Sequence, residues 1–258
     1  MRGELDEKVI LITGATSGIG LATARHFSTL GACVVGAARS HDKGREFLEQ
    51  LSVDNANVRF IATDVTINDQ VKQMLAFALD EFGRLDFAFN NAGIFIKEPL
   101  LDEHEEDIWD TVMSSNLKSV YRCMKHEVKA MLQSKPAGGV IINNASIVGH
   151  RGSTASGLAY TTAKHGVIGL TRQAALSYVD QNIRINAVSP GPTLTAATSA
   201  GLSGSEEEVT ARLTSLNPTG RTVPAEQIAK TVAFLCSSAA SMINGHDIPL
   251  DGGQLAKL

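Results

Sequence analysis

Residues 9–20 read VILITGATSGIG, and this stretch decides the fold. Its first five residues are apolar or β-branched and favour a strand. The next seven include three glycines and predict a tight turn. Apolar residues then recur at helical spacing, at Ile19, Ala22, Phe27 and Leu30. The stretch therefore predicts a buried strand that enters a helix through a glycine-rich turn, the opening half of a βαβ unit.

The same alternation continues along the chain. Further short apolar runs are rich in Val, Ile or Phe and lack polar alternation, which is typical of strands buried on both faces of a parallel sheet. These runs are residues 33–38, 58–63, 85–90, 140–146, 183–188 and 246–250. Segments with helical spacing, such as 71–82, lie between them. The sequence predicts an α/β fold: a Rossmann-type doubly wound parallel β-sheet of about seven strands, with helices on both faces.

One region departs from this rhythm. Residues 190–221, called the lid segment below, are small, polar and turn-rich, and Ser205 with Glu208 forms a capping box for one helix. An insertion of this kind is either a loose surface loop or a cover over a ligand. Its place after a strand favours the cover, because ligands of open α/β sheets bind at that edge. With no linker or internal repeat in view, we expect residues 1–258 to form a single domain.

Composition narrows the class of protein. Of the 258 residues, 43% are hydrophobic and 19% charged, which is ordinary for a globular chain. The net charge of −4 gives no basic footprint for nucleic acid. Cys33, Cys123 and Cys236 form no CxxC pair, so neither a zinc site nor a disulfide framework is indicated. We therefore expect no metal and no nucleic acid.

The ends of the chain bear on its location. The polar N-terminus leads straight into the first strand and leaves no room for a signal peptide, and no apolar run approaches the roughly 18 residues of a membrane helix. We expect a cytoplasmic protein that does not contact membranes. The final tripeptide Ala256-Lys257-Leu258 resembles a variant of the peroxisomal address, a less favoured alternative.

The glycine turn indicates a nucleotide site. A glycine-rich turn lets the backbone approach a pyrophosphate, and a helix N-terminus supplies free N–H groups and a positive dipole end. The spacing is G-x-x-x-G-x-G, not the more familiar G-x-G-x-x-G. The residues expected to contact the cofactor here are Gly14, Thr16, Ser17, Gly18, Ile19 and Gly20.

The end of the second predicted strand bears on which nucleotide binds. An acidic residue about 20 positions past the turn would bind the ribose hydroxyls of NAD. This chain has Arg39 and Ser40 there, and a guanidinium suits a 2′-phosphate. The sequence thus favours NADP(H), with NAD(H) possible because Asp42 follows closely.

Residues 159–164 read AYTTAK and place Tyr160 and Lys164 one helical turn apart. An ammonium beside a phenol favours the phenolate, so we expect Lys164 to lower the pKa of Tyr160 into the range of acid–base catalysis. Ser146 follows a strand at the same sheet edge and offers a hydroxyl to a substrate oxygen. Asn116 opens or interrupts a long helical segment, where its amide would orient a water.

These motifs, in this order, resemble the short-chain dehydrogenase/reductase family from Lys8 to Gly253. The resemblance implies a catalytic set of Asn116, Ser146, Tyr160 and Lys164. It implies further cofactor contacts from Tyr160 and Lys164 themselves, from Asp64 and Val65, from Asn91, Ala92 and Gly93 of the Asn-Asn-Ala-Gly motif, and from Pro190, Gly191 and Thr193. Thr193 follows its Pro-Gly pair more closely than is common, so Thr195 is an alternative. Asp251-Gly252-Gly253 matches the C-terminal signature of the family.

The resemblance implies an NADP(H)-dependent oxidoreductase that transfers hydride between the nicotinamide and a carbonyl or secondary alcohol by a Ser-Tyr-Lys mechanism. Alternatives are an NAD-dependent alcohol dehydrogenase of the same family, a non-catalytic nucleotide-binding regulator, and a sugar-nucleotide epimerase or dehydratase. A small-molecule substrate and a homotetramer are implied. Candidates for the substrate pocket are Phe95, Ile96, Ile147, Val148, His150, Arg151 and residues 194–216. His150 and Arg151 meet either a polar or anionic substrate or solvent.

Overall fold

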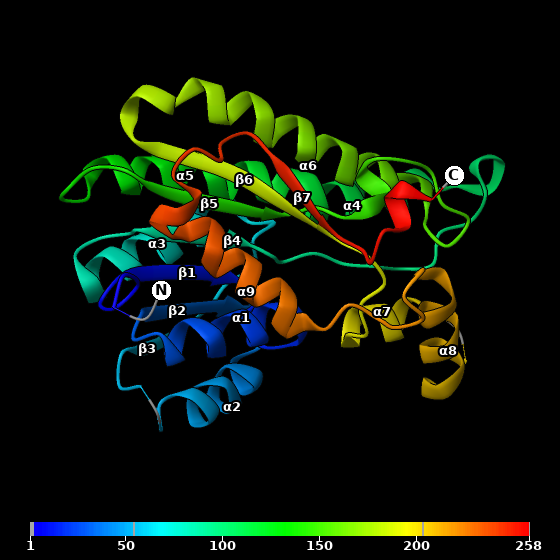
Figure 1. The fold of residues 1–258 in the computed structure, drawn as a ribbon, viewed down its shortest axis with the longest axis horizontal. Helices are drawn as coiled ribbons and strands as arrows, with labels where there is room; N and C mark the ends of the chain where they lie inside the picture. Colours follow the sequence, from blue (N-terminus) through cyan, green and yellow to red (C-terminus); the bar gives the residue numbers. More distant parts are fainter. Residues whose placement is uncertain (1–2, 54, 203, 258) are drawn as a thin grey trace.

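The computed structural model describes residues 3–53, 55–202 and 204–257. Seven parallel strands form one sheet in the order β3-β2-β1-β4-β5-β6-β7 (Figure 1). The strands are β1 (Val9–Thr13), β2 (Cys33–Ala38), β3 (Val58–Ala62), β4 (Phe87–Asn90), β5 (Gly139–Asn144), β6 (Ile183–Pro190) and β7 (Asp247–Leu250). This confirms the predicted Rossmann-type parallel sheet.

Helices cover both faces of the sheet. Residues of α1, α2 and α9 pack in one hydrophobic cluster, and residues of α3, α5 and α6 pack in the other. The helices are α1 (Gly18–Thr29), α2 (His41–Leu51), α3 (Asn68–Phe82), α4 (Glu106–Met113), α5 (Ser119–Gln133), α6 (Leu158–Ser177), α7 (Ala196–Gly201), α8 (Glu206–Leu216) and α9 (Ala225–Cys236). The doubly wound arrangement is therefore confirmed.

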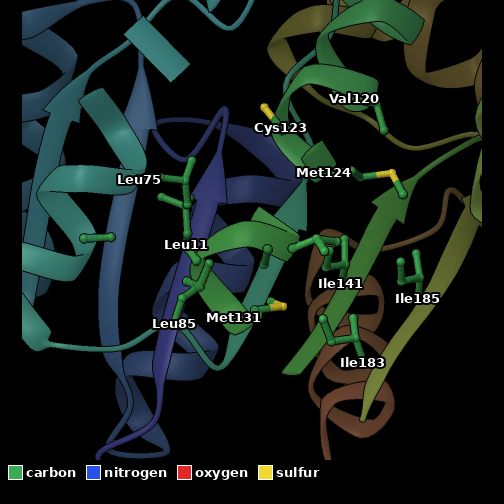
Figure 2. Packing of buried hydrophobic residues seen from close by; sticks show 14 of the residues in the cluster. Leu11, Leu75, Leu85, Val120, Cys123, Met124, Met131, Ile141, Ile183 and Ile185 are labelled. Carbon is green, nitrogen blue, oxygen red and sulfur yellow. The ribbon is translucent and has the colours of Figure 1, made fainter. Parts of the chain in front are cut away.

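Central strands send successive side chains into opposite cores, as the pleat requires. In β1, Val9 and Leu11 join the cluster under α3, α5 and α6, whereas Ile10 and Ile12 join the cluster under α1 and α9. Figure 2 shows the first cluster, in which Leu11 and Ile141 of the sheet lie among the leucine, methionine and valine side chains of the covering helices. Burial on both faces explains why these strands read as uninterrupted apolar runs.

The winding of the chain reverses between β1 and β4. The first three strands run outward as β1, β2 and β3, and the chain then returns to place β4 on the other side of β1. The loops after β1 and β4 diverge to opposite faces at this switch point, which is where open α/β sheets bind ligands. The glycine turn follows β1 and the Asn-Asn-Ala-Gly motif follows β4, so the fold places both at that position.

The lid segment differs from its prediction. It contains two helices, α7 and α8, which Figure 1 shows set apart from the sheet near the carboxyl ends of the strands. The Ser205–Glu208 capping box of α8 is present as expected. The sequence prediction missed α7, whose box pairs Thr195 with Thr198. The Thr195 hydroxyl accepts from the N–H of Thr198, and the Thr198 hydroxyl accepts from the N–H of Thr195. A threonine at the third helical position falls outside the usual S/T-x-x-E/Q pattern.

Three further observations concern special sites. In the described part of the chain, no helix is long and apolar enough to cross a membrane. Within residues 3–53, 55–202 and 204–257, no group of three or more His, Cys, Asp or Glu side chains gathers as metal ligands would. All three cysteines are buried free thiols. Leu258 of the proposed peroxisomal tripeptide lies outside the described residues.

Candidate active site

One cavity of about 270 Å³ opens at the carboxyl edge of the sheet and brings together Asn116, Ser146, Tyr160 and Lys164. Ten of the residues expected to bind the cofactor line the same cavity: Gly14, Ser17, Gly18, Ile19, Asn91, Ala92, Gly93, Pro190, Gly191 and Thr193. Residues from widely separated parts of the sequence thus meet at one concave surface.

Tyr160 and Lys164 lie one turn apart on α6 and face this cavity together. Lys164 is only 5% exposed, and its ammonium lies 5.5 Å from the centre of the Tyr160 ring. The Nζ atom donates a hydrogen bond to the carbonyl oxygen of Asn144, at 2.6 Å. That carbonyl belongs to the last residue of β5, so the strand end fixes the position of the ammonium.

The pKa of Tyr160 differs from the expectation. Burial of the phenol raises its pKa to about 12, and hydrogen bonding with the Ser146 hydroxyl opposes this rise. Burial also lowers the pKa of Lys164 to about 8. Desolvation disfavours the charged form of each group and is the largest cause of both shifts. The prediction that Lys164 lowers the pKa of Tyr160 below its ordinary value is therefore wrong. The pKa is raised instead, so the phenol is neutral at pH 7.

Ser146 stands where β5 gives way to a short 3-10 turn. β5 ends at Asn144, two residues before the predicted boundary. Ser146 caps the turn Ile147–Gly149, and its Oγ atom accepts a hydrogen bond from the backbone N–H of Val148, at 3.4 Å. This capping role holds the hydroxyl at the cavity wall, next to the Tyr160 phenol.

Asn116 interrupts the long helical segment and does not open it; the sequence had allowed both positions. A π-helical turn, Ser114–Lys118, separates α4 from α5. The Asn116 side chain is 1% exposed; its Oδ1 atom accepts from the N–H of Ile94 at 3.0 Å, and its Nδ2 atom donates to the carbonyl of Val112 at 3.1 Å. π-Turns are frequent at functional sites. The expected role in orienting a water stays a prediction.

The glycine turn has the geometry that a pyrophosphate cradle requires. Gly14 and Gly18 have φ values of +66° and +51°, a region that side chains disfavour. A Cβ atom on Gly20 would lie 2.2 Å from the carbonyl oxygen of Gly14. Ser40, Thr195 and Ser205 cap their helices with side chains, but within the described part of the chain Ser17 makes no such bond at the start of α1. The amides of that first turn are therefore available to an anion.

The loop after β4 is bonded to the glycine turn. The hydroxyl of Thr13 accepts from the amides of Asn91 and Ala92, at 3.0 and 3.1 Å. The Asn91 amide group donates to the carbonyls of Thr13 and Gly14, at 3.1 and 3.2 Å. Its Oδ1 atom accepts from the side chain of Asn144, at 2.9 Å. These bonds hold the two cofactor loops and the end of β5 as one surface.

Other predicted cofactor residues lie beyond the cavity lining formed by the described residues. Arg39 and Ser40 follow β2, and Asp64 and Val65 follow β3, along the same sheet edge. The Ser40 side chain caps α2, and Asp64 accepts from the backbone and hydroxyl of Thr66. Thr16 and Gly20 belong to the glycine turn behind the lining.

The strand end at β6 supplies the remaining contacts. Pro190 ends β6, and a Cβ atom on Gly191 would lie 2.9 Å from the Cα atom of Asp251. The Thr193 hydroxyl donates to the carbonyl of Gly191, at 3.0 Å. Thr193 and Thr195 both line the cavity, so both alternatives remain open.

His150 and Arg151 have roles that the sequence did not suggest. His150 Nε2 lies 2.5 Å from a carboxylate oxygen of Asp247, and Arg151 donates to the carbonyl oxygens of Gln254 and Lys257. Both side chains tie the loop after Ser146 to the C-terminal segment. Neither lines the main cavity as the described residues define it.

Sequence reasoning missed Thr13 and Asn144. Thr13 acts through its hydroxyl and Asn144 through its main-chain carbonyl as well as its amide. Both residues lie at strand ends, which was the available signal for a place in the site. Their contacts could not be predicted, because the residues that they join are 20 to 79 positions apart in the sequence.

Comparisons with known proteins identify the family of the chain. The family model described as enoyl-(acyl carrier protein) reductase matches residues 14–254. A 3beta-hydroxysteroid dehydrogenase of Mediterraneibacter gnavus is 36% identical, with 97% of this chain and 96% of the relative covered. A cyclohexanol dehydrogenase of an Acinetobacter species is 37% identical, with 100% and 98% covered.

A solved structure gives the same result. A tryptophan variant of actinorhodin polyketide ketoreductase with NADPH superposes with a TM-score of 0.89 at 31% identity, covering 96% of this chain and 97% of that one. The two chains therefore share the fold over almost their whole lengths. This chain belongs to the short-chain dehydrogenase/reductase family and is an NAD(P)-dependent oxidoreductase.

Proposed function

We propose that this chain is an NADP(H)-dependent oxidoreductase that interconverts a neutral ketone and its secondary alcohol. The observation that carries the proposal is the convergence of Ser146, Tyr160 and Lys164 on one cavity that also reaches the glycine turn. A proton donor and a site for a pyrophosphate are thus neighbours, as hydride transfer to a carbonyl requires.

The cofactor would lie along the carboxyl edge of the sheet. The backbone N–H groups at the start of α1 would receive its pyrophosphate, and Asp64 and Val65 would lie beside its adenine. When bound, NADPH supplies the hydride. Arg39 supports the choice of NADP(H), because it is exposed beside the end of β2 and can pair with a 2′-phosphate. Asp42, the reason to consider NAD(H), is already paired with Arg45 at 2.6 Å.

Tyr160 would donate the proton that the reduced carbonyl oxygen needs. A phenol whose pKa is raised to about 12 is protonated at neutral pH, and an alkoxide is a far stronger base than a phenolate. Ser146 holds the substrate oxygen within reach of the phenol. Lys164, with a pKa of about 8, is still mainly protonated at pH 7. It would stabilise the phenolate that remains and would hold the nicotinamide ribose.

The cavity lining supports a neutral, largely apolar substrate. Apart from Lys164, the described residues that line it carry no charged side chain. Beyond the catalytic set the wall has six apolar side chains, from Ile94, Phe95, Ile147, Val148, Leu213 and Leu216, beside uncharged polar ones such as Ser153, Ser156 and Gln254. A carboxylate or phosphate there would find little compensation for its lost hydration. The two relatives reported above are named for alcohols on rings, which agrees with a cyclic or branched ketone.

The lid segment would close over this substrate as part of a single domain of residues 1–258. We also propose a homotetramer in the cytoplasm. Exposed apolar side chains on α5 and α6 support association: Tyr121 is 50% exposed, Leu132 39% and Leu176 72%. Light scattering at micromolar concentration should give four times the chain mass; a monomer mass would contradict this assembly.

A panel of neutral and anionic ketones, each with NADPH and NADH, tests the function. We expect loss of absorbance of reduced nicotinamide with NADPH and at least one neutral cyclic ketone, and no turnover of keto acids. Faster reaction with NADH would favour the NAD-dependent alternative. No reaction with any ketone or alcohol, despite cofactor binding, would favour a non-catalytic nucleotide-binding regulator.

A further inference from the structure

A buried carboxylate outside the motif residues holds the helix that carries the catalytic pair. Glu98 lies in the loop after β4, and its side chain is 0% exposed. Its two carboxylate oxygens accept from the backbone N–H groups of Ala159 and Tyr160, at 2.7 and 3.0 Å. A residue 62 positions away in sequence therefore binds the main chain of the predicted proton donor itself.

Glu98 replaces a missing cap. The N-cap residue of α6 is Gly157, which has no side chain to satisfy the first amides of the helix. A Cβ atom on Gly157 would lie 2.1 Å from the carboxyl carbon of Glu98, so the glycine makes room for the carboxylate. A negative charge at a helix N-terminus also interacts favourably with the helix dipole.

His104 fixes the carboxylate from its other side. The Nε2 atom of His104 lies 2.9 Å from the same Glu98 oxygen that accepts from Ala159, and the imidazole is 4% exposed. The imidazole packs edge-on against Trp109, with ring centres 6.4 Å apart. Glu98 therefore has three polar partners and a restricted side chain, which is what a positioning group needs.

The same loop also contacts the Tyr160 ring and the cofactor side of the site. Phe95 meets the Tyr160 ring edge-on with centres 5.1 Å apart, and the Ile94 amide donates to Asn116. Residues 94–98 thus hold the tyrosine by its ring and its main chain, while the Ile94 amide bonds to Asn116 of the π-turn. We infer that Glu98, braced by His104, is a positioning residue that sets the place of the Tyr160 phenol relative to the nicotinamide.

This inference rests on the proposed role of Tyr160, so the test separates the two. The variants are Glu98→Ala, Glu98→Gln, His104→Ala, His104→Gln and Tyr160→Phe. The control is Asp86→Asn: Asp86 is another buried carboxylate that accepts from a main-chain amide, that of Val9 at 3.0 Å, and pairs with Arg84. Asp86 lies at the opposite edge of the sheet from the site, so its loss reports folding alone.

We expect Glu98→Ala to lower kcat for the panel ketone reduced fastest with NADPH by about 30-fold, because small misplacements of a reacting group cost up to about 100-fold. The dissociation constant of NADPH should change less than about twofold. The kcat of Glu98→Gln should lie between those of the unmodified chain and Glu98→Ala, since the amide NH₂ of glutamine opposes one backbone N–H. His104→Ala should lower kcat, and His104→Gln should retain most of it because glutamine keeps a hydrogen-bond donor. Asp86→Asn should lower the melting temperature without changing kcat.

A second readout requires no substrate. Hydrogen exchange at the amides of Ala159 and Tyr160 should be faster in Glu98→Ala than in Asp86→Asn or the unmodified chain. The inference is overturned if kcat of Glu98→Ala stays within twofold while Tyr160→Phe is inactive, if cofactor affinity falls as much as kcat, or if exchange at those two amides is unchanged. An active Tyr160→Phe would instead refute the proposed function.

Discussion

Glu127 on α5 gives a quantitative prediction about stability. The side chain is fully buried, and burial raises its pKa to about 8, opposed by the hydrogen bond from the Asn90 amide at 2.9 Å. Its second oxygen, Oε1, has no hydrogen-bond partner in the described structure, and the same is true of Asn90 Oδ1. A protonated carboxyl group suits this pair of acceptors because it adds one donor.

The neighbours of Glu127 provide no compensating cation among the described contacts. Asn90 also donates to Asn143, and Asn143 donates to Thr171, at 3.0 and 2.9 Å. The titratable neighbour is the buried thiol of Cys123, one turn earlier on α5, whose pKa burial raises. Ionised Glu127 would therefore face a polar but uncharged surface, which leaves the charge uncompensated.

The sign of the pH effect follows from linkage. Above about pH 5 the unfolded chain has lost this proton, while the folded chain keeps it up to about pH 8. The folded state then binds one more proton, so the free energy of unfolding falls by about 1.4 kcal/mol per pH unit. The contribution of Glu127 protonation to the free energy of unfolding is fully present below pH 4.5 and is lost by about pH 8. From pH 5 to 7.5 the loss is about 3 kcal/mol.

Glu127→Gln removes this titration and keeps the shape and a donor. We expect the melting temperature of the variant, relative to the unmodified chain, to rise between pH 5 and 7.5 by about 6–12 °C, since 1 kcal/mol is worth about 2–4 °C in a chain of this size. Circular dichroism at one protein concentration measures it. Glu46→Gln, on the exposed side of α2, is the control. Parallel pH curves for Glu127→Gln and the unmodified chain would refute the reasoning.

Three further predictions concern the cofactor and the lysine. Arg39→Ala should raise KM for NADPH at least tenfold and leave KM for NADH unchanged, because a pair of charge-assisted hydrogen bonds is worth about 1.5–3 kcal/mol; equal effects on both would show that Arg39 does not read the 2′-phosphate. Because burial lowers the pKa of Lys164 to about 8, the rate of ketone reduction should decline as the pH rises through 8. Lys164→Arg should be slower at every pH and should lack that decline. An identical decline in the variant would show that titration of Lys164 is not its cause. Gly20→Ala places a Cβ atom 2.2 Å from the Gly14 carbonyl, and should weaken NADPH binding at least tenfold in a fluorescence titration and cost about 1–3 kcal/mol of stability; unchanged affinity would contradict the cradle.

The strands could be predicted because burial on both faces leaves an uninterrupted apolar pattern, as in β1 and β5. Their ends were less certain. β5 ends at Asn144, whose carbonyl oxygen accepts from Lys164 and whose side-chain amide donates to Asn91. Such contacts join residues 20 and 53 positions apart, and no local pattern reports them.

The candidate site was predictable where a residue type is tied to a local motif. The glycine turn and the Tyr–Lys spacing are of this kind. Glu98 was not predictable, since a glutamate in a loop normally indicates a solvated surface and its role depends on the approach of α6. The pKa expectation for Tyr160 failed for a related reason: desolvation depends on everything packed around the phenol, which spacing along one helix does not specify.

The central claim is that the Tyr160 phenol delivers the proton in ketone reduction. Its most direct test is the single-turnover rate of NADPH oxidation by the panel ketone reduced fastest, compared for Tyr160→Phe and Tyr178→Phe. Tyr178 follows the far end of the same helix, about 27 Å away by the rise of an α-helix. We predict a loss of at least about 100-fold in Tyr160→Phe with NADPH affinity retained, and no change in Tyr178→Phe. A rate for Tyr160→Phe within threefold of the unmodified chain would contradict the claim.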